Sequence, residues 1–281
     1  MSKVKVFKGI SDAEYNALAG VRSTILSTID TKTLAHAKEK IDNPPVTTDD
    51  FRQGQAFHDL ILRPDIFNTR WGICPPNTNF TTKEGKEVKA GMIEKYGDQY
   101  LKREPYEELL KMKMGLMDHD YIRKCLENMT ETELSIQWES EVEGLDEPVL
   151  CKCRIDAIIK IGDSVMPADL KTTRNASKKE FEKSCVNYGY LIQSAHYLEG
   201  AKVAGLIDDD NNNFLHIASE KEAPFLSALY VLDDQSLEVG NQRRQRAICK
   251  YINAIESGNW KGYSEEPETI SAPAWFYNFE D

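Results

Sequence analysis

Long hydrophobic runs and paired cysteine motifs are both missing from this sequence of 281 residues. No stretch of about 18 apolar residues occurs, which excludes an ordinary membrane-spanning helix, and no apolar segment follows Met1 closely enough to act as a secretory signal. The six cysteines show no C-x-x-C spacing, which disfavours a structural zinc site or an iron–sulfur cluster. We therefore expect a cytoplasmic protein whose cysteines are reduced.

An excess of positive charge is also lacking, because 35 Lys and Arg residues face 46 Asp and Glu residues, for a net charge of −11. This balance disfavours a protein that coats nucleic acid without specificity, since such proteins are normally basic. It still permits a local basic track beside an acidic centre. The candidate basic clusters, each with a solvated surface as its alternative, are Lys83, Lys86 and Lys89; Lys178 and Lys179; and Arg243, Arg244, Arg246 and Lys250.

No internal repeat or low-complexity tract occurs, and a composition of 41% apolar and 29% charged residues is typical of a globular protein. Helices lead, strands cluster in the middle and helices return, which predicts an α/β fold with a central mixed β-sheet flanked by helices. Sequence patterning predicts helices over residues 10–40, 51–62, most of 92–129, 177–206 and 236–257, and strands over 133–138, 214–218 and 226–232.

We expect a single domain over residues 1–281, and the start at Met1 favours a whole protein over a fragment. Prolines, asparagines and lysines follow one another between residues 74 and 91, which is typical of a mobile basic arm over a site. The predicted parts are N-terminal helices over 1–62, this arm over 74–91, a sheet core over 130–232 and a C-terminal helix over 236–257.

The most informative pattern is a pair of aspartates, Asp156 and Asp169, separated by twelve residues and followed by Lys171. The intervening residues read as two strands joined at Gly162-Asp163, which predicts a hairpin. Because side chains alternate along a strand, Asp169 and Lys171 share a face while Leu170 points into the core. Two carboxylates and an amine at one spot suit a divalent cation beside a water nucleophile, the chemistry of phosphodiester hydrolysis. The alternative is a solvated strand face.

Several further residues fit a metal centre. Gly54 and His58 share one face of a predicted helix, where glycine permits a close approach and His58 offers a ligand nitrogen. Glu133 lies on the strand before the hairpin and adds a carboxylate. Gln193 and Tyr197 lie four residues apart on a helix, where they either contact a phosphate or pack between helices. Further donors to a phosphate follow the lysine at Thr172, Thr173 and Arg174.

In this order, the patterns G-x-x-x-H, E, D-x12-D-x-K and Q-x-x-x-Y resemble the PD-(D/E)XK nuclease superfamily. Within it, the chain is similar to the RecE (exonuclease VIII) branch, which is related to lambda exonuclease and to the nuclease domain of RecB. The resemblance runs from about Ile10 to the C-terminus and rests on the ordered set of motifs. The chain departs from the superfamily at Ile155, where a proline gives the motif its name, and it matches loosely over residues 21–24.

The resemblance implies a restriction-endonuclease-like core and Mg²⁺-dependent digestion of linear double-stranded DNA from its ends. Digestion would run 5′ to 3′ and leave a 3′ single-stranded overhang for recombination by strand annealing, and Mn²⁺ would substitute for Mg²⁺. The resemblance also implies a ring-shaped homo-oligomer, either a trimer or a tetramer, and a single-strand annealing partner of the RecT type. The expected setting is a phage or prophage system in the cytoplasm of a bacterial host.

The resemblance also implies roles for individual residues. The expected metal ligands are His58, Glu133, Asp156, Asp169 and the carbonyl of Leu170. Lys171 is expected to lose its proton readily near the cation and to orient or deprotonate the attacking water. The expected catalytic set is therefore Lys171, Asp169, Asp156 and Glu133, and the expected DNA contacts are Gln193, Tyr197, Thr172, Thr173, Arg174, Lys83, Lys86 and Arg22, the last to a 5′ phosphate.

Two other functions stay open at this point. A structure-dependent endonuclease on the same fold would share these residues but cut circular DNA. A non-catalytic DNA-binding module would keep the fold with a degenerate site, and the intact Asp156, Asp169 and Lys171 argue against it.

Overall fold

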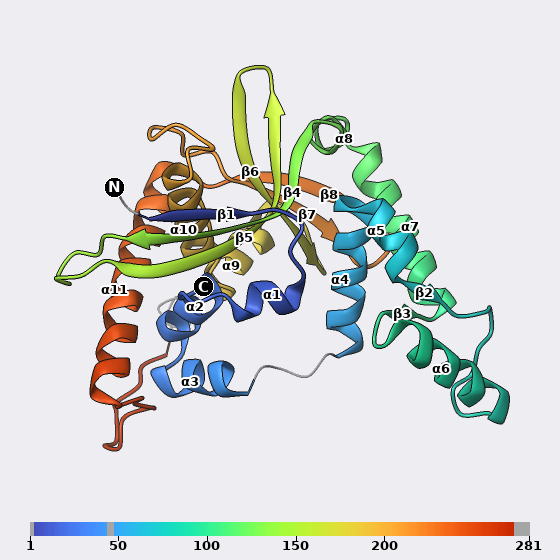
Figure 1. The fold of residues 1–281 in the computed structure, drawn as a ribbon, viewed down its shortest axis with the longest axis horizontal. Coiled ribbons are helices and arrows are strands. Elements are labelled where there is room, and N and C mark those ends of the chain that lie inside the picture. Colours follow the sequence, from blue (N-terminus) through green and yellow to red (C-terminus); the bar gives the residue numbers. More distant parts are fainter. Residues whose placement is uncertain (1–2, 44–47, 273–281) are drawn as a thin grey trace, which may run out of the picture.

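The computed structural model describes residues 3–43 and 48–272, and its centre in these ranges is a six-stranded sheet (Figure 1). The strand order is β1-β4-β5-β6-β7-β8, and only β6 and β7 run parallel. The predicted mixed sheet is therefore confirmed. The strands are β1 (Val4–Phe7), β4 (Met129–Ser140), β5 (Val149–Ile161), β6 (Ser164–Thr173), β7 (Leu215–Glu220) and β8 (Ser227–Val231).

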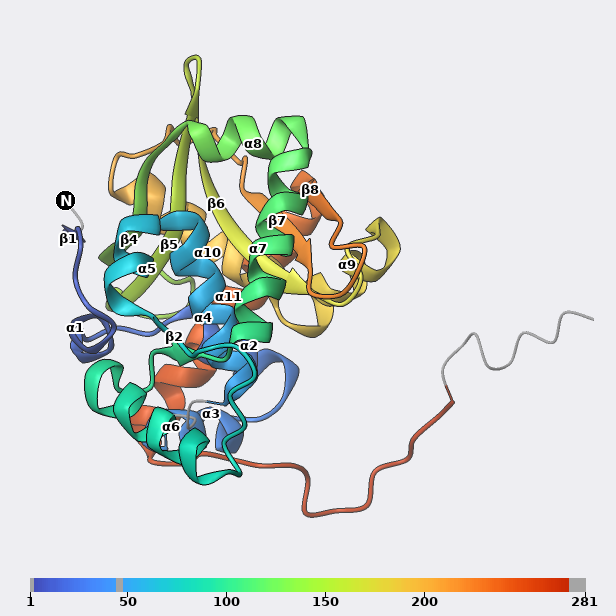
Figure 2. The same cartoon turned by 90° about the vertical axis from the view of Figure 1, so that its right-hand side faces the viewer.

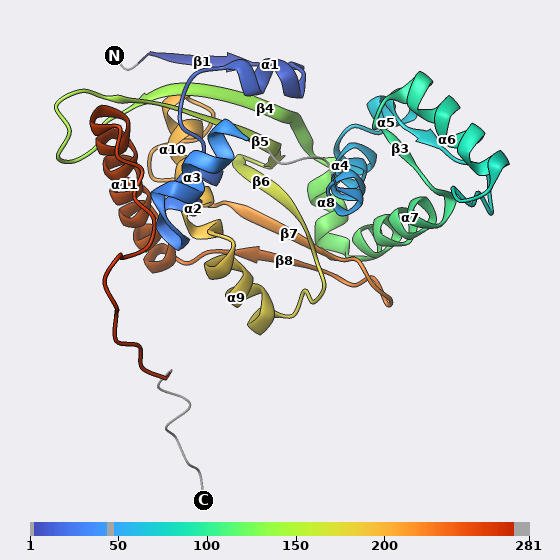
Figure 3. The ribbon, with the colours of Figure 1, turned by 90° about the horizontal axis from the view of Figure 1, so that it is seen from below.

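Helices flank this sheet, as the sequence predicted. Figure 2 shows α7 and α8 beside β6 and β7, and Figure 3 shows α2, α10 and α11 gathered at the other end. A short parallel pair, β2 (Gly72–Ile73) and β3 (Tyr100–Leu101), lies outside the main sheet. The helices are α1 (Asp12–Ala17), α2 (Ser23–Thr31), α3 (Leu34–Asp42), α4 (Asp49–Leu62), α5 (Pro64–Arg70), α6 (Lys83–Tyr96), α7 (Arg103–Asp118), α8 (Asp120–Glu127), α9 (Lys178–Asn187), α10 (Tyr190–Val203) and α11 (Asp234–Ser257).

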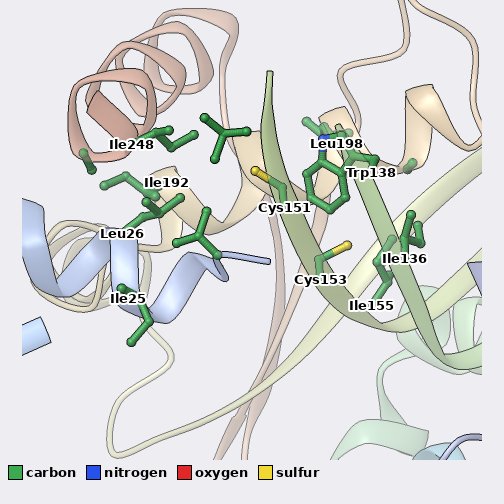
Figure 4. Packing of buried hydrophobic residues seen from close by; sticks show 14 of the residues in the cluster. Ile25, Leu26, Ile136, Trp138, Cys151, Cys153, Ile155, Ile192, Leu198 and Ile248 are labelled. Atoms are coloured by element: carbon green, nitrogen blue, oxygen red, sulfur yellow. The ribbon is translucent and has the colours of Figure 1, made fainter. Parts of the chain in front are cut away.

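Two large groups of buried apolar side chains hold the layers together. One packs α2, α10 and α11 against β4 and β5, and its centre contains Leu26, Trp138 and Ile248 (Figure 4). Cys151 and Cys153 lie in the same cluster as buried free thiols, so they act as small core side chains. The second group packs α4, α5, α7 and α8 against β5, β6 and β7. Both groups include side chains of β5, so the two packed layers meet on this strand.

The central elements follow the prediction closely. The strand predicted over 133–138 lies inside β4, and β5 and β6 form the predicted hairpin around Gly162. The helix predicted over 236–257 is α11, and it ends at Gly258 in the left-handed conformation. In the described ranges, 3–43 and 48–272, no helix combines the length and apolar character that crossing a membrane requires.

Three predictions of long or missing helices were wrong. Residues 10–40 form three helices, because the chain crosses to pair Val21 with Cys151 and then restarts at the Thr33 cap of α3. Residues 177–206 form two helices, α9 and α10, separated at Gly189. The φ of Gly189 is +72°, and a Cβ there would lie 2.5 Å from Ser27 Oγ, so this break needs glycine.

The segment 74–91, predicted as a loop, contains the start of α6. The side chain of Thr82 accepts a hydrogen bond from the backbone N–H of Gly85 and caps this helix. Gly85 lies so close to the Asn79 carbonyl that a side chain would not fit. The lysine-rich sequence is therefore a capped helix over part of its length. The prediction of mostly helix over 92–129, with a new helix starting at Pro105, agrees with the structure, in which α6 ends at Tyr96, β3 follows and α7 starts at Arg103.

Because two histidines are buried, we expect the free energy of unfolding to fall in acid. Burial lowers the pKa of His196 to about 3, helped by Arg244, and burial lowers the pKa of His216 to about 4. Each is neutral in the fold but binds a proton below about pH 6.5 when unfolded. Stability is therefore complete above pH 6.5 and is lost as the pH falls through the folded pKa, by up to about 1.4 kcal/mol per pH unit and per histidine.

The measurement is urea unfolding at pH 7, 6 and 5 for the wild type and for His196→Gln. The substitution keeps a donor for the Lys152 carbonyl, which lies 3.1 Å from His196 Nε2. The variant should lose less stability per pH unit than the wild type. Equal slopes for the two proteins would contradict the assignment.

Candidate active site

A histidine and two carboxylates from three different elements meet at one point. His58 on α4, Glu133 on β4 and Asp156 on β5 each place one ligand atom within 4.8 Å of the others. The Nδ1 atom of His58 lies 3.4 Å from Oδ2 of Asp156. The sequence predicted each of these residues as a metal ligand, and the structure brings these three together.

The backbone of Glu133 is unusual for a strand residue, with a φ of +51°. It lies between the paired positions Thr132/Ala157 and Leu134/Ile155, directly across the ladder from Asp156. A left-handed conformation costs a non-glycine residue about 1 kcal/mol or more, so the surrounding sheet must hold it. We infer that this local strain aims the Glu133 carboxylate at His58 and Asp156.

The remaining predicted residues of the hairpin form a second group. Lys171 Nζ lies 2.7 Å from Asp169 Oδ2 and donates to Gln193 Oε1 at 2.9 Å. Gln193 Nε2 in turn donates to Asp169 Oδ1 at 2.5 Å, so the amide of α10 bridges both charged groups. The Leu170 side chain is in the core as predicted, and its backbone N–H donates to Asp156 Oδ2 at 2.8 Å. That hydrogen bond joins the two groups.

The carboxylates crowd one another. Burial, followed by the charge of Asp169, raises the pKa of Asp156 well above its ordinary value. Burial, followed by the charge of Asp156, raises the pKa of Glu133 to about 7. Burial lowers the pKa of His58 and keeps its imidazole neutral, the form that binds metals. The raised pKa values show that the two carboxylates lack enough positive charge around them. Together with the neutral imidazole nitrogen, they fit a divalent cation such as Mg²⁺ or Mn²⁺.

The carboxylates around Lys171 favour its charged form, and the expectation that a nearby cation makes its proton easy to lose stays a prediction. Burial lowers its pKa, but Asp169, Tyr190 and Asp156 outweigh burial and raise the pKa above its ordinary value. Its ammonium also lies 4.4 Å from the centre of the Tyr190 ring. In this arrangement Lys171 is a fixed positive charge, suited to stabilising an anion more than to removing a proton.

A cleft of about 960 Å³ opens from the carboxylates. His58, Glu133 and Asp156 line it at the sheet. Arg22, between α1 and α2, and Lys40 on α3 line it from another side. The acidic cluster therefore lies in a cleft that also has basic residues on its walls. The negative net charge of the chain had still permitted such local basic residues beside an acidic centre.

The structure separates the predicted DNA contacts. Thr172 and Arg22 line the cleft, and Gln193 lies beside the lysine. Tyr197 packs edge-on against Phe214 at 5.9 Å, because the helix face on which it lies joins the core. Thr173 caps a turn through Asn175, and Arg174 is exposed. Lys83 and Lys86 are exposed on α6 and do not line the cleft.

Two arginines near the site were missed. Arg154 lies 3.8 Å from Glu133 Oε2 and donates to Asp12 Oδ1 at 2.6 Å. Strand alternation offered a signal for it, because Arg154 lies two residues before Asp156. Arg63 donates to the buried Asp59 at 3.1 Å and lowers the pKa of Glu133 and Asp156, against the effect of burial. Arg63 lies at the end of α4, where no repeating pattern in the sequence indicates a role in the site.

A mixed six-stranded sheet flanked by helices is consistent with a restriction-endonuclease-like fold. Residues 23–273 match the family described as "PDDEXK-like domain of unknown function", and this chain belongs to that family. The family supports a hydrolytic nuclease, and the cluster of His58, Glu133 and Asp156 is a possible site for a divalent metal. The superfamily predicted from the sequence is therefore confirmed.

One solved structure supports the same fold. A protein from Eubacterium rectale named "Putative exonuclease" aligns with a TM-score of 0.60 and 11% sequence identity. The alignment covers 95% of this chain and 96% of the other. The structure of SSO0001 aligns with a TM-score of 0.35 and 13% identity, over 83% of this chain and 80% of the other. A search of curated proteins found no match.

Proposed function

We propose that residues 1–281 form one nuclease domain, a Mg²⁺-dependent exodeoxyribonuclease similar to the RecE branch. It would digest linear double-stranded DNA from its ends, 5′ to 3′, and leave a 3′ single-stranded overhang. The observation that carries this proposal is the cluster of His58, Glu133 and Asp156 beside the bridged Asp169–Lys171 pair, in a cleft with basic walls. The name given to the Eubacterium rectale protein points in the same direction.

His58, Glu133 and Asp156 would hold the proposed cation, and Asp169 and the Leu170 carbonyl would be further oxygen donors. A bound divalent cation supplies a polarised phosphate and a bound water of lowered pKa. The protein supplies the geometry. Because the Leu170 N–H holds Asp156 and Gln193 holds Asp169, the carboxylates are oriented before substrate arrives.

Lys171 would donate to a non-bridging phosphate oxygen and stabilise the charge that develops during hydrolysis in line with the 3′ oxygen. Gln193 Oε1 fixes the ammonium by accepting a hydrogen bond from it at 2.9 Å. Thr172 and Arg22, both in the cleft, are proposed contacts to the DNA backbone. Roles for Tyr197, Thr173, Arg174, Lys83 and Lys86 stay predictions of the resemblance, and their surroundings add no support.

The biological setting is also a proposal. A ring-shaped trimer or tetramer, a RecT-type annealing partner and a phage or prophage origin rest on the resemblance to the RecE branch.

The proposal is tested with two DNA substrates of equal length in Mg²⁺. One is linear duplex with 5′ phosphates and a radioactive label at the 5′ or the 3′ end, and the other is covalently closed circular duplex. We expect loss of the linear DNA with early release of the 5′ label, an intact circle, and no digestion by Lys171→Ala. Cutting of the circle would establish the endonuclease instead, early release of the 3′ label would reverse the polarity, and binding without cutting would establish the non-catalytic module.

A further inference from the structure

The far end of the cleft carries an exposed aromatic side chain on the same helix as His58. Phe51 lines the cleft and is 55% exposed, an unusual position for a large apolar ring. It lies seven residues before His58 on α4, which corresponds to about 10 Å along the helix axis. Residues seven apart share one face of a helix, so Phe51 and His58 face the same cleft.

The helix surface between these two residues is open. Gly54 lines the cleft there, and a Cβ built on it would meet nothing within 4 Å. Gln55, the next residue, also lines the cleft and offers a polar amide. A polymer backbone can therefore lie along α4 from His58 to Phe51 without displacing a side chain.

The other walls of the cleft favour an anionic polymer. Burial and the neighbouring charges of Lys32 and Arg22 lower the pKa of Lys40. Burial and Arg22 lower the pKa of Lys152 to about 8. Arg22, Lys40 and Lys152 all line the cleft. The Lys152 ammonium already donates to three backbone carbonyls, so Arg22 and Lys40, whose charged groups each make one hydrogen bond among the described residues, are the two of these cations that can still pair with phosphates. Phosphates spaced along one DNA strand would supply these negative partners.

We propose that Phe51 stacks on an unpaired nucleobase of the DNA strand whose phosphate is hydrolysed at the carboxylate cluster. The rise of about 10 Å along α4 between Phe51 and His58 corresponds to about three nucleotides at the stacked, duplex spacing of about 3.4 Å each. Ile41, 40% exposed and on another wall of the same cleft, adds apolar surface near the base. The strand would thus enter with its phosphates toward the basic wall and a base on Phe51.

This inference rests on the proposed function for its substrate, and it selects a nucleobase over an apolar protein segment for two reasons. The Phe51 surface is continuous with the carboxylate cluster through one cleft, and the cleft walls carry basic groups. An aromatic ring stacks on any base, so Phe51 would hold the strand without reading its sequence.

The test measures binding without hydrolysis, by fluorescence anisotropy of a labelled single strand in EDTA. Abasic nucleotides replace each of the first six positions from the 5′ end in turn, and each strand is titrated with wild type, Phe51→Ala and Phe51→Trp. One abasic position should weaken wild-type binding by about 5- to 150-fold, the range expected for loss of one stacked base. Phe51→Ala should weaken the intact strand by a similar factor, and Phe51→Trp should bind like the wild type.

The decisive result is the combination of both changes. If Phe51 and that base stack on each other, the abasic strand should bind Phe51→Ala no more weakly than the intact strand does. The proposal would be overturned if the abasic position weakened binding to Phe51→Ala by the same factor as it weakens binding to the wild type. Unchanged binding of the intact strand by Phe51→Ala would also overturn it, and this is the result expected if Phe51 instead contacts a protein. No abasic effect at any position in the wild type would also overturn it.

A matched control is Tyr121→Ala, which removes an aromatic ring that is 47% exposed on α8 and does not line the cleft. It should bind every strand like the wild type. Equal urea midpoints for Phe51→Ala and the wild type would show that the exposed ring leaves the fold intact. Because the readout is affinity in EDTA, it is independent of whether the wild type hydrolyses DNA in Mg²⁺.

Discussion

Replacing Asp156 with asparagine is expected to lower the rate of DNA hydrolysis by about a thousandfold or more. The substitution keeps the shape of the side chain and an oxygen that can accept from the Leu170 N–H, now 2.8 Å from Asp156 Oδ2. It removes the charge that faces His58 and Glu133. General acid–base and electrostatic contributions of single groups reach about 10²- to 10⁴-fold, and Asp156 is proposed to support both metal binding and charge stabilisation. The measurement is the single-turnover rate on linear duplex in Mg²⁺.

The same substitution is expected to stabilise the metal-free protein. Burial and Asp169 raise the pKa of Asp156, so the fold disfavours its charged form at neutral pH. Stability associated with Asp156 is present at low pH and is lost as the pH rises through its raised folded pKa. An asparagine carries no such cost at pH 7. The urea midpoint in EDTA should therefore rise for Asp156→Asn while activity is lost.

Added Mg²⁺ should separate the two proteins further. A ligand at one hundred times its dissociation constant stabilises a fold by about 2.7 kcal/mol, so Mg²⁺ should raise the midpoint of the wild type and have little effect on Asp156→Asn. Asp163→Asn, in the exposed turn of the same hairpin, is the matched control and should behave like the wild type in both measurements. An active Asp156→Asn protein would refute the proposed site.

The sequence was sufficient to predict the sheet core because its signals are local. Alternation around Asp156 and Asp169 and the turn at Gly162 specify the hairpin, and the structure forms it in that register. The helix breaks were not predictable in the same way. The break at Gly189 depends on contact with Ser27, more than 150 positions away, and a glycine inside a helical pattern does not reveal its φ.

In the candidate site, too, the features with a local sequence signal were predictable and those that depend on tertiary packing were not. His58, Glu133 and Asp156 were found as an ordered motif, although no spacing rule indicates that Glu133 takes a left-handed backbone conformation. The bridge from Gln193 to both Asp169 and Lys171 depends on how α10 packs over β6, which is a tertiary property. Burial lowers the pKa of Lys171, but Asp169 on the same face of β6, together with Tyr190 and Asp156, raises it above its ordinary value.

The basic cluster Arg243, Arg244, Arg246 and Lys250 shows how composition misleads. Arg244 is only 1% exposed, and its NH1 lies 2.5 Å from Glu199 Oε2 on α10. Glu199 also accepts from Trp138 Nε1 at 3.0 Å and from Ser140 Oγ at 2.8 Å. An arginine in such a network cannot reach a phosphate, and it joins α11 to α10 and β4 instead.

Replacing Glu199 with alanine is therefore expected to destabilise the fold by about 3 kcal/mol or more. The change leaves the buried charge of Arg244 without its carboxylate and removes an acceptor from Trp138 and Ser140. Breaking a buried ion pair by removing one partner costs about 3–5 kcal/mol, because the remaining charge is neither paired nor hydrated. Glu199→Gln should cost less, since an amide oxygen still accepts from Trp138 Nε1. The measurement is the free energy of unfolding in urea.

Two further variants separate the buried charge from the rest of the network. In Glu199→Gln combined with Arg244→Met, no uncompensated charge is left, so the cost should be smaller than the sum of the two single costs. Arg243→Ala is the matched control one position away, because Arg243 pairs with Asp30 at 2.8 Å at a half-exposed site. Exposed pairs contribute about 0–1 kcal/mol, so this variant should stay close to the wild type. A cost for Arg243→Ala equal to that of Glu199→Ala would mean that burial of Arg244 does not govern the stability of α11.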